Sequence, residues 1–262
     1  MTELTQSISQ VYEQPLNERV RLLLRLEIIF LQAIRHKQAR NQYETQMCLD
    51  ALFALLNLTN RYELRSEILK ELERIRSMLV QLLREENANA EKIDGTLIEL
   101  QTCADILHGL DSKHIDRIRN IEFLNIIKQR NIHDTGSYLF EIPELQYWLL
   151  QAESHREKQI QKWLDDFMPF KRAIDFLLSL IRDSASPEVM IAENGIYLKT
   201  IDSRLHMHQL LRVRVDENYN VYPRISGGKH RFAIRFMEQI QADTRPKQTE
   251  KNVRFSLQTC VL

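Results

Sequence analysis

The sequence predicts an α+β protein, with a large N-terminal helical bundle followed by a small antiparallel β-strand domain. The 262 residues include only 6 Gly and 6 Pro, which favours long helices. Up to about residue 183, apolar side chains recur at helical spacing. Beyond about residue 190 they alternate with polar ones between turn signals, as is typical of strands with one wet face. We therefore predict a helical domain at residues 1–184 and a β-strand domain at 185–262.

The helices follow from apolar periodicity and from capping residues. Asn17 is the expected N-cap of a helix that runs to about Arg40, and this helix is apolar almost all round, which predicts burial. Further helices are expected over about 42–58, 63–85, 91–107 and 112–130. Pro143 should open a short helix, and Pro169 should end the next helix and start the last one, which runs to Asp183.

The strands are expected only beyond about residue 190. Apolar residues alternate with arginines at 211–215 and at 231–236, and further strand segments are expected near 196–198, 221–225 and 253–257. Ser226-Gly-Gly-Lys229 is interpreted as a hairpin turn. It lacks the G-x-x-x-x-G-K-[ST] spacing of a phosphate loop and precedes a strand where such a loop needs a helix.

Charge balance and cysteine content narrow the function classes. Lys plus Arg and Asp plus Glu each number 36, so the net charge is zero, which argues against a nucleic-acid binder. The three cysteines are widely spaced and include no C-x-x-C pair, which argues against a zinc ribbon and against a disulfide framework. A protein with free cysteines is expected in a reducing compartment. No signal peptide is recognisable, and the apolar stretch Val20–Ile34 is interrupted by charges. We therefore expect a cytoplasmic protein with no membrane partner.

Basic residues gather in the predicted hairpin, where residues 224–235 carry four formal positive charges and no carboxylate. The set is Arg224, Lys229, His230, Arg231 and Arg235. Positions 231 and 235 share one strand face, opposite the apolar side chains. Arg212 and Arg214 have the same phase on their own strand, so neighbouring strands would form an arginine plate. The alternative is an ordinary solvated β face, although such a face normally includes carboxylates as cross-strand partners.

Two arginines lie one turn apart on the otherwise apolar first helix. Arg21 and Arg25 share a helix face. They could form internal salt bridges to Glu18, Glu27 or another helix, or they could line a groove for an acidic partner. Both interpretations remain open at this point.

No pattern in the sequence predicts catalysis, a metal or a cofactor. His206 and His208 share one face of a strand, but no third ligand is close in sequence. No Ser, Cys or His stands in a recognisable nucleophile context. We therefore expect a protein that is not an enzyme.

Two longer strings resemble the ZapD family of bacterial cell division proteins. One is Pro15-Leu-Asn-Glu-Arg-Val-Arg-Leu-Leu-Leu-Arg-Leu-Glu27, and the other is Tyr222-Pro-Arg-Ile-Ser-Gly-Gly-Lys-His-Arg-Phe-Ala-Ile-Arg-Phe-Met237. The order and spacing agree from about Tyr12 to Leu257. Glu122 departs from the pattern, since an arginine would align there.

The resemblance implies a cytoplasmic homodimer at the mid-cell division site. Such a protein would bind the C-terminal tail of the tubulin-like division GTPase FtsZ and would crosslink FtsZ filaments to stabilise the Z-ring. The tail-binding residues implied by the resemblance are Arg21, Arg25, Arg61, Lys229, Arg231 and Arg235, and the charge pattern adds Arg224 and His230. The alternative function is a nucleic-acid-binding module that uses the same basic β face. Its affinity should fall steeply with salt, because many counterions are released.

Overall fold

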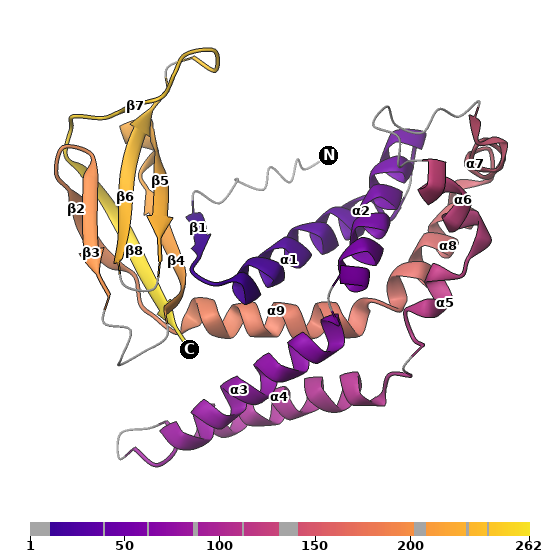
Figure 1. The fold of residues 1–262 in the computed structure, drawn as a ribbon, viewed down its shortest axis with the longest axis horizontal. Helices are drawn as coiled ribbons and strands as arrows, with labels where there is room; N and C mark the ends of the chain where they lie inside the picture. Colours follow the sequence, from indigo (N-terminus) through magenta and orange to yellow (C-terminus); the bar gives the residue numbers. More distant parts are fainter. Residues whose placement is uncertain are drawn as a thin grey trace. The chain divides into compact units, whose positions relative to one another are not determined.

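The computed structural model describes residues 11–38, 40–61, 63–85, 89–111, 113–130, 141–201, 208–228, 231–239 and 241–262. The chain divides into two compact units. The first unit consists of the N-terminal residues up to Leu22 together with Leu178–Leu262. The second unit is Leu23–Leu177. A series of helices precedes most of the antiparallel strands (Figure 1), so the predicted α+β class is confirmed.

The helices form where apolar residues recur with helical spacing. In chain order they are α1 (Glu18–His36), α2 (Gln42–Arg61), α3 (Leu64–Leu82), α4 (Ala90–Gly109), α5 (Asp116–Arg119), α6 (Glu122–Arg130), α7 (Pro143–Leu149), α8 (Glu153–Asp165) and α9 (Met168–Asp183). Asn17 caps α1 as predicted, because its Oδ1 accepts a hydrogen bond from the Val20 N–H at 2.9 Å. None of the described helices has an apolar run long enough to cross a bilayer.

The helical unit has its own core. Leu26 and Phe30 of α1 are fully buried, and α3 and α4 run side by side (Figure 1). Three aromatic rings from α6, α7 and α8 pack together, since the ring centroids of Phe123, Trp148 and Trp163 lie 5.3–6.1 Å apart.

The prediction of one continuous helix over residues 112–130 is wrong. The chain turns at Asn120, whose φ of −90° and ψ of 5° leave the helical region, and α5 and α6 lie on either side of it. The Ile121 carbonyl then accepts the Asn125 N–H at 3.0 Å and starts α6. The turn lets Ile118 of α5 and Ile127 of α6 both be buried.

The other unit holds the described strands in two antiparallel sheets. The strands are β1 (Val11–Pro15), β2 (Glu188–Ala192), β3 (Ile196–Thr200), β4 (His208–Val215), β5 (Val221–Gly227), β6 (Arg231–Glu238), β7 (Lys247–Gln248) and β8 (Val253–Val261). The first sheet has the order β1-β4-β8-β2, and the second has the order β3-β6-β5 with β7 paired to β6. One buried cluster includes Val213 and Phe255 from the first sheet and Phe236 from the second, so the sheets pack as a sandwich.

The prediction that strands occur only beyond about residue 190 is wrong at the N-terminal end. β1 pairs with β4 along its whole length, from Val11 opposite Arg214 to Pro15 opposite Leu210. These five residues show no apolar alternation of their own. Their extended conformation comes from a pairing with residues about 200 positions later in the chain, as between Glu13 and Arg212.

A carboxylate on β1 holds the outer face of the first sheet against the end of α9. Glu13 accepts hydrogen bonds from Arg182 of α9 and from Arg212 of β4, each at 2.8 Å. Burial raises the pKa of Glu13, but the hydrogen bonds and charges of the two guanidinium groups outweigh burial and lower the pKa below its ordinary value of 4.5.

We expect Glu13→Gln to lower the free energy of unfolding by about 1–3 kcal/mol at pH 7. Because the folded-state pKa is depressed, the carboxylate stabilises the fold above its ordinary pKa of 4.5, and this contribution is lost as pH falls through the folded-state value. Urea unfolding between pH 3 and 7 should therefore show the two proteins converging at low pH. Glu250→Gln, at an exposed position, is the control. A difference that stayed constant across this range would contradict the ionic role of Glu13.

Candidate functional site

The β5–β6 hairpin brings two of the predicted arginines face to face. In the register of the two strands, Arg224 lies directly opposite Arg235. Residues that are directly opposite in an antiparallel pair share a sheet face, and residues two apart on one strand share it too. Arg231 therefore lies on the same face as the pair, which is the outer face of the second sheet. Phe232, on the other face of β6, is buried in the sandwich.

This outer face carries positive charge without negative charge. We call it the arginine face and define it by the outward positions of β3, β5 and β6, which are Ile196, Leu198, Thr200, Tyr222, Arg224, Ser226, Arg231, Ala233, Arg235 and Met237. None of these residues is a carboxylate. Like charges placed directly opposite each other destabilise a sheet, so the pairing of Arg224 with Arg235 contributes nothing favourable to the fold.

The three guanidinium groups of the arginine face are available to a partner. Arg224, Arg231 and Arg235 are exposed. Within the described part of the chain, none of them has a hydrogen bond or an ion pair. An anionic ligand can therefore reach all three without displacing an internal carboxylate, and charge-assisted hydrogen bonds to carboxylates are among the stronger ones in proteins.

The proposed extension of this plate to Arg212 and Arg214 is wrong. β4 belongs to the first sheet and β6 to the second, so these arginines lie on the opposite side of the sandwich. Arg212 is also occupied, because its Nε donates to Glu13 at 2.8 Å and its Nη1 donates to Gln258 at 2.8 Å. The alternation correctly predicted that these arginines point outward from their strands. The error lay in assuming that β4 and β6 were neighbours in one sheet.

Arg21 and Arg25 of α1, also predicted as site residues, differ in their ion pairs and lie in different units. Arg21 pairs with the exposed Glu18 at 3.1 Å, and such a surface pair contributes little. Arg25, on the same helix, is exposed and has no recorded partner in the described part of the chain. Arg21 belongs to the unit of the sheets, whereas Arg25 belongs to the helical unit.

Three further predicted residues cannot be placed as side chains. Arg61 is the last residue of α2, but its side chain lies outside the described residues. Lys229 and His230 also lie outside the described residues. Their roles remain predictions.

One residue of the arginine face escaped the sequence analysis. Leu198 of β3 lies opposite Ala233 and is 68% exposed, so it forms an apolar spot between Arg231 and Arg235. The sequence signal was ambiguous, because Ile196 and Leu198 alternate with Tyr197 and Lys199 and either pair could face the core.

A metal site requires several ligating side chains together, and a reactive thiol requires a lowered pKa. The described residues contain no group of three or more His, Cys, Asp or Glu that could hold a metal ion, and His206 lies outside them. The three cysteines are buried and free. Burial raises the pKa of Cys48 to about 12 and is the main reason why the pKa of Cys260 rises to about 11, so these thiols stay protonated and unreactive.

A family model described as "ZapD: Cell division protein" matches residues 24–235. The chain belongs to the ZapD family of cell division proteins. It is 33% identical to the Cell division protein ZapD of Janthinobacterium sp. (strain Marseille), with 95% of this chain and 98% of that protein covered. It is 31% identical to the ZapD of Methylococcus capsulatus, with 96% and 98% covered, and 30% identical to that of Chromobacterium violaceum, with 95% and 98% covered.

Family membership confirms the resemblance seen in the sequence. The similarity to the ZapD proteins spans nearly the whole chain, so it includes both the helices and the strands that carry the arginine face. A role in cell division follows for this member of the ZapD family.

Reversing one charge of the like-charged pair should stabilise this ZapD-family fold. Arg235→Glu places a carboxylate opposite Arg224, and we expect the free energy of unfolding to rise by about 0.2–1 kcal/mol. Arg231→Glu is the matched control, since Thr200 stands opposite Arg231 and no such gain is available. Chemical denaturation of the three proteins would test this. A loss of more than about 1 kcal/mol in Arg235→Glu would mean that Arg235 supports the fold.

Proposed function

We propose that this chain is a non-enzymatic adaptor that binds the C-terminal tail of FtsZ through its arginine face and crosslinks FtsZ filaments at the mid-cell division site. The observation that carries the proposal is a sheet face with three exposed arginines, no carboxylate and no internal partners for those arginines among the described residues. Membership of a family of cell division proteins supports the cellular setting.

The chemistry of the arginine face suits a short acidic peptide. Arginine binds carboxylates with two parallel hydrogen bonds, which gives direction as well as strength. Leu198, exposed between Arg231 and Arg235, offers an apolar contact for an aliphatic or aromatic side chain of the same peptide. A peptide with carboxylates on either side of one apolar residue would use both features.

A nucleic acid is the second candidate partner for the same arginines. The net charge of zero disfavours it. The apolar residue between Arg231 and Arg235 is also aliphatic, Leu198. The one aromatic residue of the described arginine face, Tyr222, lies beyond Arg224 at its edge, whereas single-stranded nucleic acids stack on aromatic rings. Salt dependence separates the two, because phosphate binding releases many counterions and weakens steeply as salt rises.

Charge reversal on the arginine face should abolish tail binding without unfolding the protein. We expect Arg231→Glu and Arg235→Glu each to weaken binding of a synthetic FtsZ tail peptide by more than about tenfold, because each change replaces attraction by repulsion. Fluorescence anisotropy measures the affinity, and circular dichroism reports the fold. Leu198→Asp should weaken binding as well, since it removes the apolar contact and adds a negative charge.

Two controls make this test specific. Arg214→Glu is the same change at an exposed strand position of the other sheet, and it should leave tail binding unaltered. Ile234→Asp, at a fully buried position, shows what loss of the fold looks like. If Arg214→Glu weakened binding as much as Arg235→Glu, long-range charge would account for the effect and the arginine face would not be the site.

Crosslinking adds the requirement for two tail sites in one particle, which we propose a homodimer provides. A monomer with one site decorates a filament, whereas a two-fold dimer presents two identical sites. After one site is engaged, the second binds at an effective concentration that can reach roughly the millimolar range. We place the dimer surface on the helical unit, where large apolar side chains such as Val80 and Ile98 are exposed.

Light scattering should then report about twice the chain mass of 31.2 kDa. The double variant Val80→Glu, Ile98→Glu should be monomeric, bind the isolated tail peptide with unchanged affinity and fail to bundle FtsZ filaments in a sedimentation assay. Monomers that still bundled filaments would contradict the two-site mechanism. A variant that remained dimeric would place the dimer surface elsewhere.

A further inference from the structure

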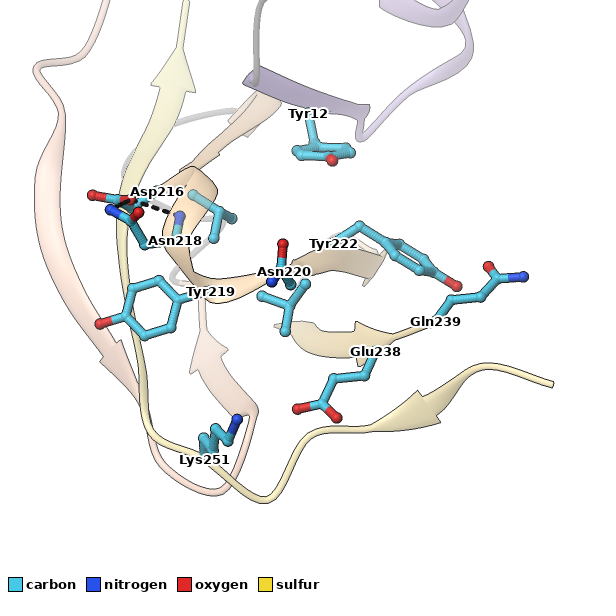
Figure 2. Close-up of a pocket in the computed structure, with 11 residues that line it drawn as sticks. Tyr12, Asp216, Asn218, Tyr219, Asn220, Tyr222, Glu238, Gln239 and Lys251 are labelled. Atoms are coloured by element: carbon cyan, nitrogen blue, oxygen red, sulfur yellow. Dashed lines mark hydrogen bonds between the residues drawn. The ribbon is translucent and has the colours of Figure 1, made fainter. Parts of the chain in front are cut away.

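A cavity lies at the far end of the β5–β6 hairpin, away from its turn. Its volume is about 900 Å³, within the range of ligand-binding clefts. Figure 2 shows side chains from β1, the β4–β5 connection, β5, the end of β6 and the β7–β8 connection around it.

Three tyrosines from separate segments stand around this opening. Tyr12 comes from β1, Tyr219 from the short 3-10 turn η2 (Glu217–Tyr219) and Tyr222 from β5. In Figure 2 they lie on different sides of the same space. Tyrosine rings present a negative π face, which attracts a cation.

The connection that carries Tyr219 is held in a fixed shape. The Asp216 carboxylate accepts the Asn218 N–H at 2.9 Å, and the Tyr219 N–H donates to the Asp216 carbonyl at 3.2 Å. Asn220 follows with a φ of 49°, in the left-handed region that Asn tolerates. Tyr219 and Asn220 are therefore positioned before any ligand arrives.

Internal hydrogen bonds engage the side-chain amide donors of Asn218 and Gln239, two of the amide residues that line the cavity. Asn218 Nδ2 donates to Asp216 at 2.6 Å, and Gln239 Nε2 donates to the carbonyl of Ala242 at 3.0 Å. The side-chain oxygens of Asn218 and Gln239 remain. Glu238 accepts from the Thr249 hydroxyl through one oxygen, and its Oε2 has no recorded partner in the described part of the chain.

Charge points in the same direction as the hydrogen bonds. Among the described lining residues, two carboxylates, Asp216 and Glu238, outnumber one ammonium group, Lys251. The excess of carboxylates over ammonium groups therefore favours a ligand that carries positive charge and several donors. Guanidinium has five N–H donors in a plane, carries no acceptor and stacks on aromatic rings.

We propose that this cavity binds a guanidinium group, carried by an arginine side chain in a peptide segment of a partner protein. Glu238 accepts from the guanidinium, the tyrosines contact its planar faces, and the remaining volume holds the neighbouring peptide residues. The cavity thus selects a basic peptide, whereas the arginine face selects an acidic one. The proposal does not rest on tail binding by the arginine face.

The test uses the full chain and N-acetyl-arginine-N′-methylamide as the probe, followed by NMR chemical-shift perturbation. We expect saturable binding, weakened about fivefold or more by Glu238→Gln and by Tyr219→Ala, because each removes a contact to the cation. The citrulline analogue, a neutral molecule of similar shape, should not bind. Arg235→Ala, outside the cavity, should leave the affinity unchanged.

Several results would overturn the proposal. They are no saturable binding of the arginine probe, equal affinity for the citrulline analogue, equal affinity for the corresponding lysine derivative, or binding that neither cavity variant weakens. Saturable binding of glucose in place of the arginine probe would also overturn it, since the cavity would then be a saccharide site. A peptide of three residues with a central arginine should bind more tightly than the single residue. Equal affinity would contradict the peptide part of the proposal.

Discussion

The half-buried carboxylate of Glu13 holds together segments that lie far apart in the sequence. It links β1 to β4 through Arg212 and to the end of α9 through Arg182. Without it, the guanidinium groups of Arg182 and Arg212 would both lose the carboxylate that they share. The pairing of β1 with β4 supplies the backbone hydrogen bonds, but the ionic contact also closes α9 over that sheet.

Arg212 of the first sheet has internal partners, whereas the arginines of the arginine face have none among the described residues. In the first sheet, Arg212 is held by Glu13 and Gln258, so its charge serves the fold. In the second sheet, Arg224 and Arg235 lie directly opposite each other, and the outward positions described for β3, β5 and β6 include no carboxylate, so these two charges oppose the fold. Binding surfaces commonly accept such a cost, because an internal partner would compete with the ligand. This contrast within one sandwich is the physical reason why we propose the second sheet as the binding surface.

Sequence periodicity predicted those features of the fold that depend on residues close to one another in the chain. The long helices and the outward phase of Arg231 and Arg235 follow from the spacing of apolar residues alone. The strand at Val11–Pro15 and the separation of Arg212 from Arg235 depend on which strands pair, and no local pattern contains that information. The cavity lined by Tyr12, Tyr219 and Glu238 could not be foreseen for the same reason, since it joins strands from both ends of the chain.

The position of β8 has a consequence for how this protein is made. β8 runs between β4 and β2 in the middle of the first sheet, yet its residues, Val253–Val261, leave the ribosome after those of every other strand. The helical unit, Leu23–Leu177, is contiguous and can fold on the nascent chain. The first sheet cannot form in full until synthesis has passed residue 261. Until then β4 lacks its neighbour β8, and the apolar face of β6 lacks part of the sheet that packs against it. A chain that ends near residue 250 would therefore have a folded helical unit and an incomplete, aggregation-prone sandwich.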